Sequence, residues 1–354
     1  MSNNFCRFLS NGYSIELTSS NLKVKPCCWY RGGFELDDNL VQNIESRSQI
    51  TTWTPGCSVC EQQEAAGHPS FRKSSFDIVP EINSHVPVAL DINIDMTCNA
   101  ACVICNPSFS TLWAKQLAIK NNSIYIKSEN NLDFALDRIL KNLDLSQLRR
   151  IKFFGGEPLL TDTHIKILKK IPNPEQVDIW YTTNASVFPK QHVLKIWEKF
   201  KLIYFEASID AIGTQFEYIR WPLKWKKVEH NLLSLKTHGT NNLLFRINHT
   251  LNPFNIYYYD RLDNWIKEHL SSNRLGDPTE INIHPCWGIW ALEKTPIELR
   301  DRVYDKYTNH VISNILSSHS VEDYDSILNF TQEWDPVRKL YWQDIFPELI
   351  KYFP

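Results

Sequence analysis

Three cysteines lie close together in the stretch MTCNAACVIC, at Cys98, Cys102 and Cys105. Their spacing, C-x3-C-x2-C, places three thiols in one short loop. Thiolates bind zinc and iron–sulfur clusters, and a closed zinc site takes four ligands. Three clustered cysteines therefore favour a 4Fe–4S cluster with one iron left open for a substrate. A zinc site with a fourth ligand from elsewhere, or three buried structural cysteines, are the alternatives.

The other cysteines form two further groups. Five precede residue 61, namely Cys6, Cys27, Cys28, Cys57 and Cys60, and Cys286 stands alone. Clustered cysteines in intracellular proteins more often bind metal than form disulfides. The first group therefore predicts a second metal site, either an auxiliary 4Fe–4S cluster or a structural zinc. Two adjacent cysteines rarely bind one metal ion, so the choice between Cys27 and Cys28 stays open.

Composition and charge narrow the class of protein. The chain has 354 residues, 43% of them hydrophobic, and a formal net charge of −2. This charge balance gives no excess of basic residues of the kind that indicates nucleic-acid binding. No long uncharged apolar run predicts a membrane span, and residues 1–17 lack the pattern of a signal peptide. We therefore expect a cytoplasmic protein.

Strand-like and helix-like segments alternate through the middle of the chain. Strands are expected at 88–94, 150–154, 177–183, 202–208, 243–251 and 280–284, and helices at 108–121, 132–146, 163–171, 189–199, 224–237 and 257–270. Apolar strands separated by helices are typical of a parallel sheet built from βαβ units. The pattern predicts an α/β fold with a partial (β/α)6 TIM-like barrel. In such barrels the chemistry lies at the C-terminal ends of the strands.

Both ends of the chain depart from this alternation. We expect a small Cys-rich metal-binding region at 1–80, the barrel at 86–285 and a helical C-terminal extension at 286–354. The first region has a short strand candidate at 13–17, and a metal would stabilise it in place of a large apolar core. The extension has helical candidates at 296–317 and 337–351.

The cysteine triplet, directly after the first barrel strand, resembles the signature of the radical S-adenosylmethionine (SAM) superfamily. The resemblance implies that the open iron of the cluster binds the amino and carboxylate groups of SAM. It also implies that an electron from the cluster cleaves SAM to methionine and a 5′-deoxyadenosyl radical, which abstracts hydrogen from a substrate. The position before the last cysteine is often aromatic in this family, whereas here it is Ile104.

Further matches follow at the ends of successive strands. They are Gly155-Gly156-Glu157-Pro158, Thr183-Asn184, Ser208-Ile209-Asp210 and Glu217-Tyr218-Ile219-Arg220. They resemble the family's GGE motif, its TN pair, its S-x-D motif and the EYxR stretch of relatives with auxiliary clusters. The resemblance implies that Glu157 accepts a hydrogen bond from the SAM ammonium group. It further implies that Ser208 and Asp210 contact the ribose and that Arg220 pairs with the SAM carboxylate.

The two ends of the chain resemble a twitch/SPASM-like group of radical SAM proteins. The resemblance lies in KPCCWY and PGCSVCEQQEAAGHPSFR near the N-terminus, and in WDPVRKLYWQDIFPEL at 334–349. It implies an auxiliary 4Fe–4S cluster in a region that here precedes the barrel, whereas in most relatives it follows. A peptide substrate, such as a precursor peptide, and an electron donor such as flavodoxin or ferredoxin are implied as partners.

Cys286 follows the sixth predicted strand, on the face where the barrel's chemistry is expected. It is interpreted as a buried core thiol, as the hydrogen-atom donor of a peptide epimerase, or as a ligand of the auxiliary cluster. Epimerisation of a ribosomally made peptide is the first hypothesis for the reaction. Thioether or carbon–carbon crosslinking and small-molecule modification are the enzymatic alternatives. The alternative from a different functional class is a binding protein, without enzymatic activity, that zinc stabilises at both cysteine sites.

Overall fold

The computed structural model describes residues 5–17, 22–35, 46–47, 49–65, 67, 70–80, 86–93, 95–123, 132–272, 276–307, 312 and 323–353. The chain divides into two compact units. The first comprises Met1–Thr97, Ile126–Thr182 and Pro189–Tyr204, and the second comprises Cys98–Tyr125, Thr183–Phe188 and Phe205–Pro354. Within the described ranges, no helix is long and apolar enough to cross a membrane.

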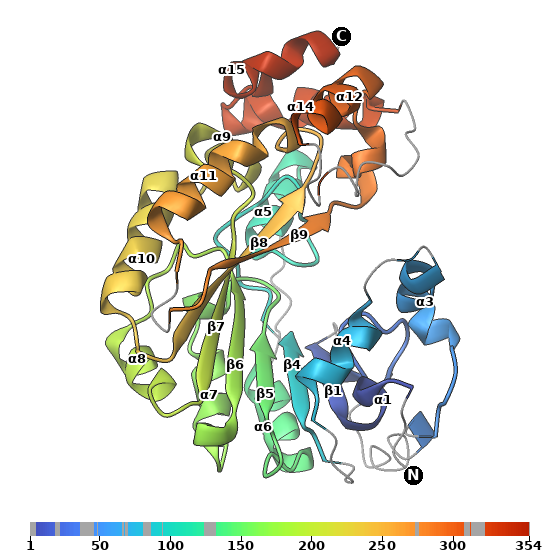
Figure 1. Ribbon diagram of the computed structural model, residues 1–354, viewed down its shortest axis with the longest axis vertical. Helices are drawn as coiled ribbons and strands as arrows, with labels where there is room; N and C mark the ends of the chain where they lie inside the picture. Colours follow the sequence, from blue (N-terminus) through green and yellow to red (C-terminus); the bar gives the residue numbers. More distant parts are fainter. Residues whose placement is uncertain are drawn as a thin grey trace. The chain divides into compact units, whose positions relative to one another are not determined.

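The first unit is built on a mostly parallel sheet (Figure 1). Its strands are β1 (Gly12–Leu17), β2 (Leu22–Lys25), β3 (Phe34–Glu35), β4 (Ala89–Asn93), β5 (Arg150–Phe153) and β6 (Asp178–Thr183). They follow the order β3-β2-β1-β4-β5-β6. The pairs from β1 through β4 and β5 to β6 are parallel, whereas β2 runs antiparallel to β1 and to β3. The N-terminal segment thus contributes its own strands to the edge beside β4.

The helices of the first unit are α1 (Arg7–Asn11), α3 (Ser58–Ala65), α4 (Phe71–Ile78), α6 (Leu132–Asn142), α7 (Thr163–Leu168) and α8 (Gln191–Trp197). Short 3-10 turns are η1 (Pro55–Cys57), η2 (Pro158–Leu160) and η3 (Pro174–Gln176). Ser70 caps α4, because its hydroxyl accepts a hydrogen bond from the Lys73 amide. A buried cluster that includes Cys6, Phe8 and Val88 joins α1 to the start of β4.

The second unit contains three strands in its described residues. They are β7 (Leu202–Ser208), which begins in the first unit, β8 (Leu243–Leu251) and β9 (Glu280–Pro285), in the order β7-β8-β9. Of these, β8 and β9 pair in parallel. Its helices and 3-10 turns are α5 (Thr111–Lys120), α9 (Gly213–Ile219), α10 (Trp225–His238), η4 (Ile256–Tyr258), α11 (Tyr259–His269), η5 (Gly288–Trp290), η6 (Leu292–Lys294), α12 (Ile297–Lys306), α14 (Asp325–Arg338), α15 (Trp342–Ile345) and η7 (Pro347–Tyr352). A buried cluster of Ala101, Trp113 and Trp334 joins the cysteine loop to α5 and α14.

The predicted α/β class is confirmed, and each of the six central strands lies within about a residue of its expected place. The expected helix at 337–351 is wrong. α14 ends at Arg338, and Lys339 adopts a left-handed φ of 53°, which terminates a helix. The short α15 and η7 follow, the latter starting at Pro347, whose missing N–H suits only the first turn of a helix. Of the expected helix 296–317, α12 covers Ile297–Lys306, while 308–311 and 313–317 lie outside the described residues.

Candidate functional site

The cysteine loop, residues 98–105, is anchored within the second unit by backbone hydrogen bonds. The Ala101 amide donates to the Trp221 carbonyl over 2.7 Å, and the Val103 amide donates to the Ile219 carbonyl over 2.8 Å. The indole N–H of Trp113, on α5, donates to the Cys102 carbonyl over 2.8 Å. The loop is therefore fixed at three points by its own neighbours.

The three thiols of this loop differ in exposure, and burial raises the pKa of two of them. Cys102 is 7% exposed, while Cys98 and Cys105 are half-buried. Burial raises the pKa of the Cys102 thiol, which the positive charge of Arg220 opposes. Burial also raises the pKa of Cys105 to about 11, with a further contribution from Cys102. Deprotonation of these thiols as ligands therefore requires a cation, which a cluster iron would supply.

Two of the predicted motifs meet at this loop through a buried ion pair. A guanidinium nitrogen of Arg220, Nη2, lies 2.6 Å from Asp210 Oδ2, and Nη1 lies 3.9 Å from the Cys102 sulfur. The other Asp210 oxygen accepts a hydrogen bond from the Thr250 amide over 2.8 Å. Burial alone would lower the pKa of Arg220, but Asp210 and Cys102 outweigh it and raise that pKa. Ser208, the first residue of the S-x-D motif, is half-buried at the end of β7.

Removal of the acidic partner from this pair is expected to destabilise the second unit. Asp210→Asn leaves Arg220 buried without its counter-ion, which costs about 3–5 kcal/mol. The exposed pair Lys267–Asp263 on α11 provides a matched control, because Asp263→Asn should cost only about 0.3–0.5 kcal/mol. Urea unfolding of both variants measures the difference, and equal midpoints would contradict the prediction.

The TN pair also contacts the cysteine loop. The Asn184 side-chain amide donates to Asn99 Oδ1 over 3.0 Å, and the Asn99 amide donates to the Ser186 hydroxyl over 2.8 Å. The Thr183 hydroxyl accepts a hydrogen bond from the Ala185 amide over 3.1 Å, which supports the turn. Asn184 is 6% exposed and therefore holds one side of the loop in place.

The GGE motif lies in the first unit and is packed against the end of β4. A Cβ on Gly156 would lie 2.3 Å from the Thr97 carbonyl oxygen, so only glycine fits there. Gly155 has a φ of +120°. The Glu157 amide donates to the Thr97 carbonyl over 2.7 Å, and the Glu157 carboxylate accepts from the Leu159 amide over 3.1 Å. The motif is thereby held on the segment that leads into Cys98.

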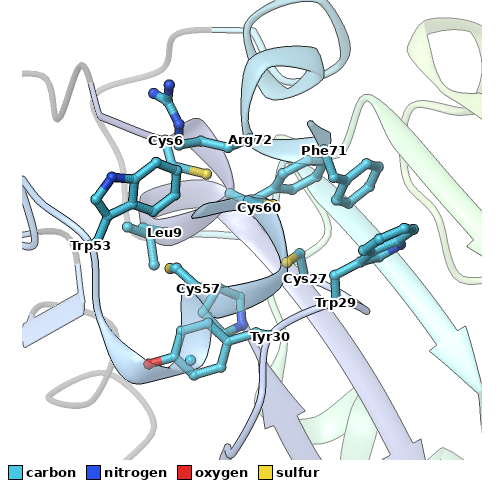
Figure 2. Close-up of a pocket in the computed structure, with 13 residues that line it drawn as sticks. Cys6, Leu9, Cys27, Trp29, Tyr30, Trp53, Cys57, Cys60, Phe71 and Arg72 are labelled. Atoms are coloured by element: carbon cyan, nitrogen blue, oxygen red, sulfur yellow. The ribbon is translucent and has the colours of Figure 1, made fainter. Parts of the chain in front are cut away.

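A second candidate site is a pocket in the first unit (Figure 2). Four of the N-terminal cysteines line it, namely Cys6, Cys27, Cys57 and Cys60. Cys6 precedes α1, Cys27 follows β2, Cys57 ends η1 and Cys60 belongs to α3. Figure 2 shows their sulfur atoms around a common space, flanked by the rings of Trp29, Tyr30, Trp53 and Phe71.

Cys28 is not among the residues that line this pocket. The pKa of its thiol is raised to about 12. Burial is the largest cause, and the negative charge of Asp91 on β4 is the second. Lys152 and Arg150 on β5 act on the same thiol. Cys28 therefore lies toward β4 and β5, while Cys27 lies toward the other cysteines.

The pocket's donor set suits a metal centre. Burial raises the pKa of Cys6, Cys27 and Cys60, and the pKa of each is raised further by at least one other thiol of the group. All nine cysteines are free of disulfides. Across the described part of the chain, no three His, Cys, Asp or Glu side chains stand close enough together to hold a single metal ion. The ligands of a cluster bind different irons and are spaced more widely than those of one zinc ion.

Cys286 lies in the second unit, directly after β9. Its thiol is buried, and its amide donates to the Leu251 carbonyl over 2.8 Å. Burial, followed by the charge of Asp210, raises the pKa of Cys286 to about 12. The thiol is therefore protonated at neutral pH. It does not line the pocket of the first unit.

Several contacts of the loop were not anticipated from the sequence, among them those of Asn99, Ser186 and Arg338. Asn99 lies inside the cysteine motif itself, and a polar residue next to Cys98 was its only signal. Ser186 follows the TN pair by two residues. Arg338 comes from α14, and one of its nitrogens donates to the Ala101 carbonyl over 2.9 Å. No local pattern connects Arg338 to a loop 237 residues away.

Comparisons with known proteins give structural similarities only. No protein-family model matches the sequence, and no curated protein matches it. Among solved structures, anSMEcpe with bound AdoMet is similar at a TM-score of 0.43 and 16% identity, over 66% of this chain and 63% of that chain. TYW1 with a lysine–pyruvate adduct bound is similar at a TM-score of 0.36 and 12% identity, over 77% and 90% of the two chains. This chain thus spans less than two thirds of the length of anSMEcpe.

Proposed function

We propose that this protein is a radical SAM enzyme that binds a 4Fe–4S cluster through Cys98, Cys102 and Cys105. The observation that carries the proposal is the meeting of separate sequence motifs at one loop. Asn184 contacts the loop, and Arg220, paired with Asp210, reaches the Cys102 sulfur. These residues belong to three motifs that resemble parts of a SAM site. A scaffold for zinc would not require them.

The residues of the second unit fit this group. Three thiols that form no disulfide lie on one anchored loop, and two of them are half-buried and therefore reachable. Arg220 is 9% exposed, and its Nε atom has no hydrogen-bond partner among the described residues, so it can still donate to a bound carboxylate. Cys98, Cys102 and Cys105 would hold the cluster, which would supply the electron for cleavage of SAM to methionine and a 5′-deoxyadenosyl radical. The roles of Gly155, Gly156 and Glu157, like the partial barrel, stay predictions from the sequence.

The decisive experiment is anaerobic. The protein is reconstituted with iron and sulfide, reduced with dithionite and incubated with SAM. Release of 5′-deoxyadenosine is expected. Zinc in place of iron, with no nucleoside formed, would support the zinc-stapled binding protein instead.

We further propose that Cys6, Cys27, Cys57 and Cys60 bind an auxiliary 4Fe–4S cluster. Their arrangement around one pocket supports this. Four thiolates would complete the cluster's ligands, so this site would take no substrate at iron. Electron relay from a donor such as flavodoxin or ferredoxin, and stabilisation of the N-terminal segment, are the roles open to it.

For the substrate we propose a peptide, and for the reaction epimerisation, in which Cys286 gives its hydrogen atom to a substrate carbon radical. The thiyl radical left on Cys286 then takes one electron from the electron donor and one proton from solvent. A buried thiol with a pKa of about 12 keeps the S–H bond that such a donor needs. With a candidate precursor peptide as substrate, reaction in D2O is expected to add one deuterium per modified residue, because thiols exchange their proton with solvent. Cys286→Ala should abolish this product while 5′-deoxyadenosine is still released. Unlabelled product contradicts epimerisation, and a loss of two hydrogens by mass indicates crosslinking instead.

A further inference from the structure

Arg338, the last residue of α14, lies against the cysteine loop of the second unit. Its side chain is 6% exposed, and Nη2 donates to the Ala101 carbonyl over 2.9 Å. Ala101 immediately precedes Cys102, a ligand in the proposed function. A fixed positive charge is therefore held next to the loop that carries the three thiols.

Aromatic rings surround this guanidinium. Its central carbon lies 5.0 Å from the ring centre of Trp113, 5.5 Å from those of Trp221 and Phe330, and 5.7 Å from that of Trp334. Such contacts favour a cation, but the rings carry no net charge and do not neutralise it. Nε and Nη1 have no hydrogen-bond partner among the described residues.

Among the described residues, no carboxylate forms a direct ion pair with Arg338. Asp335, three residues earlier on α14, acts on it through its charge, but its two oxygens accept hydrogen bonds from the Tyr218 hydroxyl and the Trp342 amide, both over 2.8 Å. Arg220, the other cation at the loop, is already paired with Asp210 at 2.6 Å. Burial of an uncompensated cation costs several kcal/mol, so a buried arginine is expected to face an anion.

We propose that Arg338 is the counter-charge of the cluster on Cys98, Cys102 and Cys105 and that it raises the cluster's reduction potential. The inference rests on the proposed function. A 4Fe–4S cluster with three thiolates is anionic, and uptake of one electron makes it more so. A fixed positive charge in a poorly solvated site stabilises the reduced form more than the oxidised form. Arg338 thus acts on the cluster through its positive charge and does not contact the substrate in this role.

The test is a redox titration of the full-length, reconstituted protein, followed by electron paramagnetic resonance. The relevant signal is the one that changes when SAM is added. In Arg338→Met and Arg338→Gln the midpoint potential is expected to become more negative at unchanged iron content. The loop should persist in both, because Ala101, Val103 and Cys102 keep their bonds to Trp221, Ile219 and Trp113. The Gln variant also keeps an N–H donor for the Ala101 carbonyl.

Two controls separate charge from packing. Arg338→Lys keeps the charge and should titrate near the wild-type potential. Lys339→Gln removes a charge one residue further on, but in an exposed side chain that solvent screens, and should leave the potential unchanged. A wild-type potential in either cluster-loaded neutral variant, or an equal shift in Arg338→Lys, overturns the inference. If the wild-type protein held no cluster that responds to SAM, the proposed function itself would be overturned. The iron content of the wild-type protein would reveal this case.

Discussion

Replacement of Cys98, Cys102 and Cys105 by alanine is expected to abolish 5′-deoxyadenosine release and to remove about four of about eight irons per chain. The cause is direct, because no other described thiol of the second unit lies in the anchored loop. Cys286, the remaining cysteine of that unit, follows β9 and is buried elsewhere. The four irons that remain would belong to the auxiliary site of the first unit.

Cys286→Ala is the matched control for this experiment. It removes a buried thiol from the same unit without touching the loop, so iron content and nucleoside release should both persist. Iron and sulfide analysis, together with chromatography of the nucleoside, measures the two quantities. Full nucleoside release by the triple variant would refute the assignment of the loop as the SAM-cleaving site. A loss of all iron would instead indicate that the two sites are not independent.

The second large effect is expected at the pocket of the first unit. Cys27→Ser should remove about four irons per chain, whereas Cys28→Ser should remove none. Of these two neighbouring cysteines, only Cys27 lines the pocket. Metal binding and folding are coupled where a small region has little core of its own. The N-terminal segment of Cys27→Ser should therefore be cleaved faster by protease than that of Cys28→Ser.

The two substitutions are closely matched, since both exchange a largely buried thiol for a hydroxyl at neighbouring positions. Iron content and the rate of proteolysis are measured on both reconstituted variants. Equal iron loss in the two would mean that the pocket's four cysteines are not the ligand set. If the wild-type pocket held zinc and only Cys27→Ser lost it, the four cysteines would still be the ligands. The bound group would then be a structural zinc ion and not the proposed cluster.

The amino-acid sequence by itself determined the strands and the order of the motifs. Apolar strand runs such as 202–208 and 243–251 lie where they were expected, because strand patterning is local and each run is bounded by turn residues. The cysteine spacing and the glycines of the GGE motif were recognisable for the same reason. Each depends on residues that are neighbours in the chain.

The C-terminal segment shows where local patterns fail. Residues 337–351 have apolar spacing that resembles a helix, yet Lys339 adopts a left-handed conformation and ends α14. Its neighbours pack instead through Trp342 and Phe346, which lie against Phe254. The energy of that burial outweighs the weak preference for a continuous helix.

Only the tertiary structure decided which groups face one another. Cys27 and Cys28 are adjacent, and their opposite environments follow from the path of the chain after β2, which the sequence does not encode locally. Arg338 reaches Ala101 across 237 residues, and the Thr250 amide, on β8, donates to Asp210 across 40 residues. Such pairings depend on the packing of elements that are distant in the chain, and they place the charges around the proposed cluster.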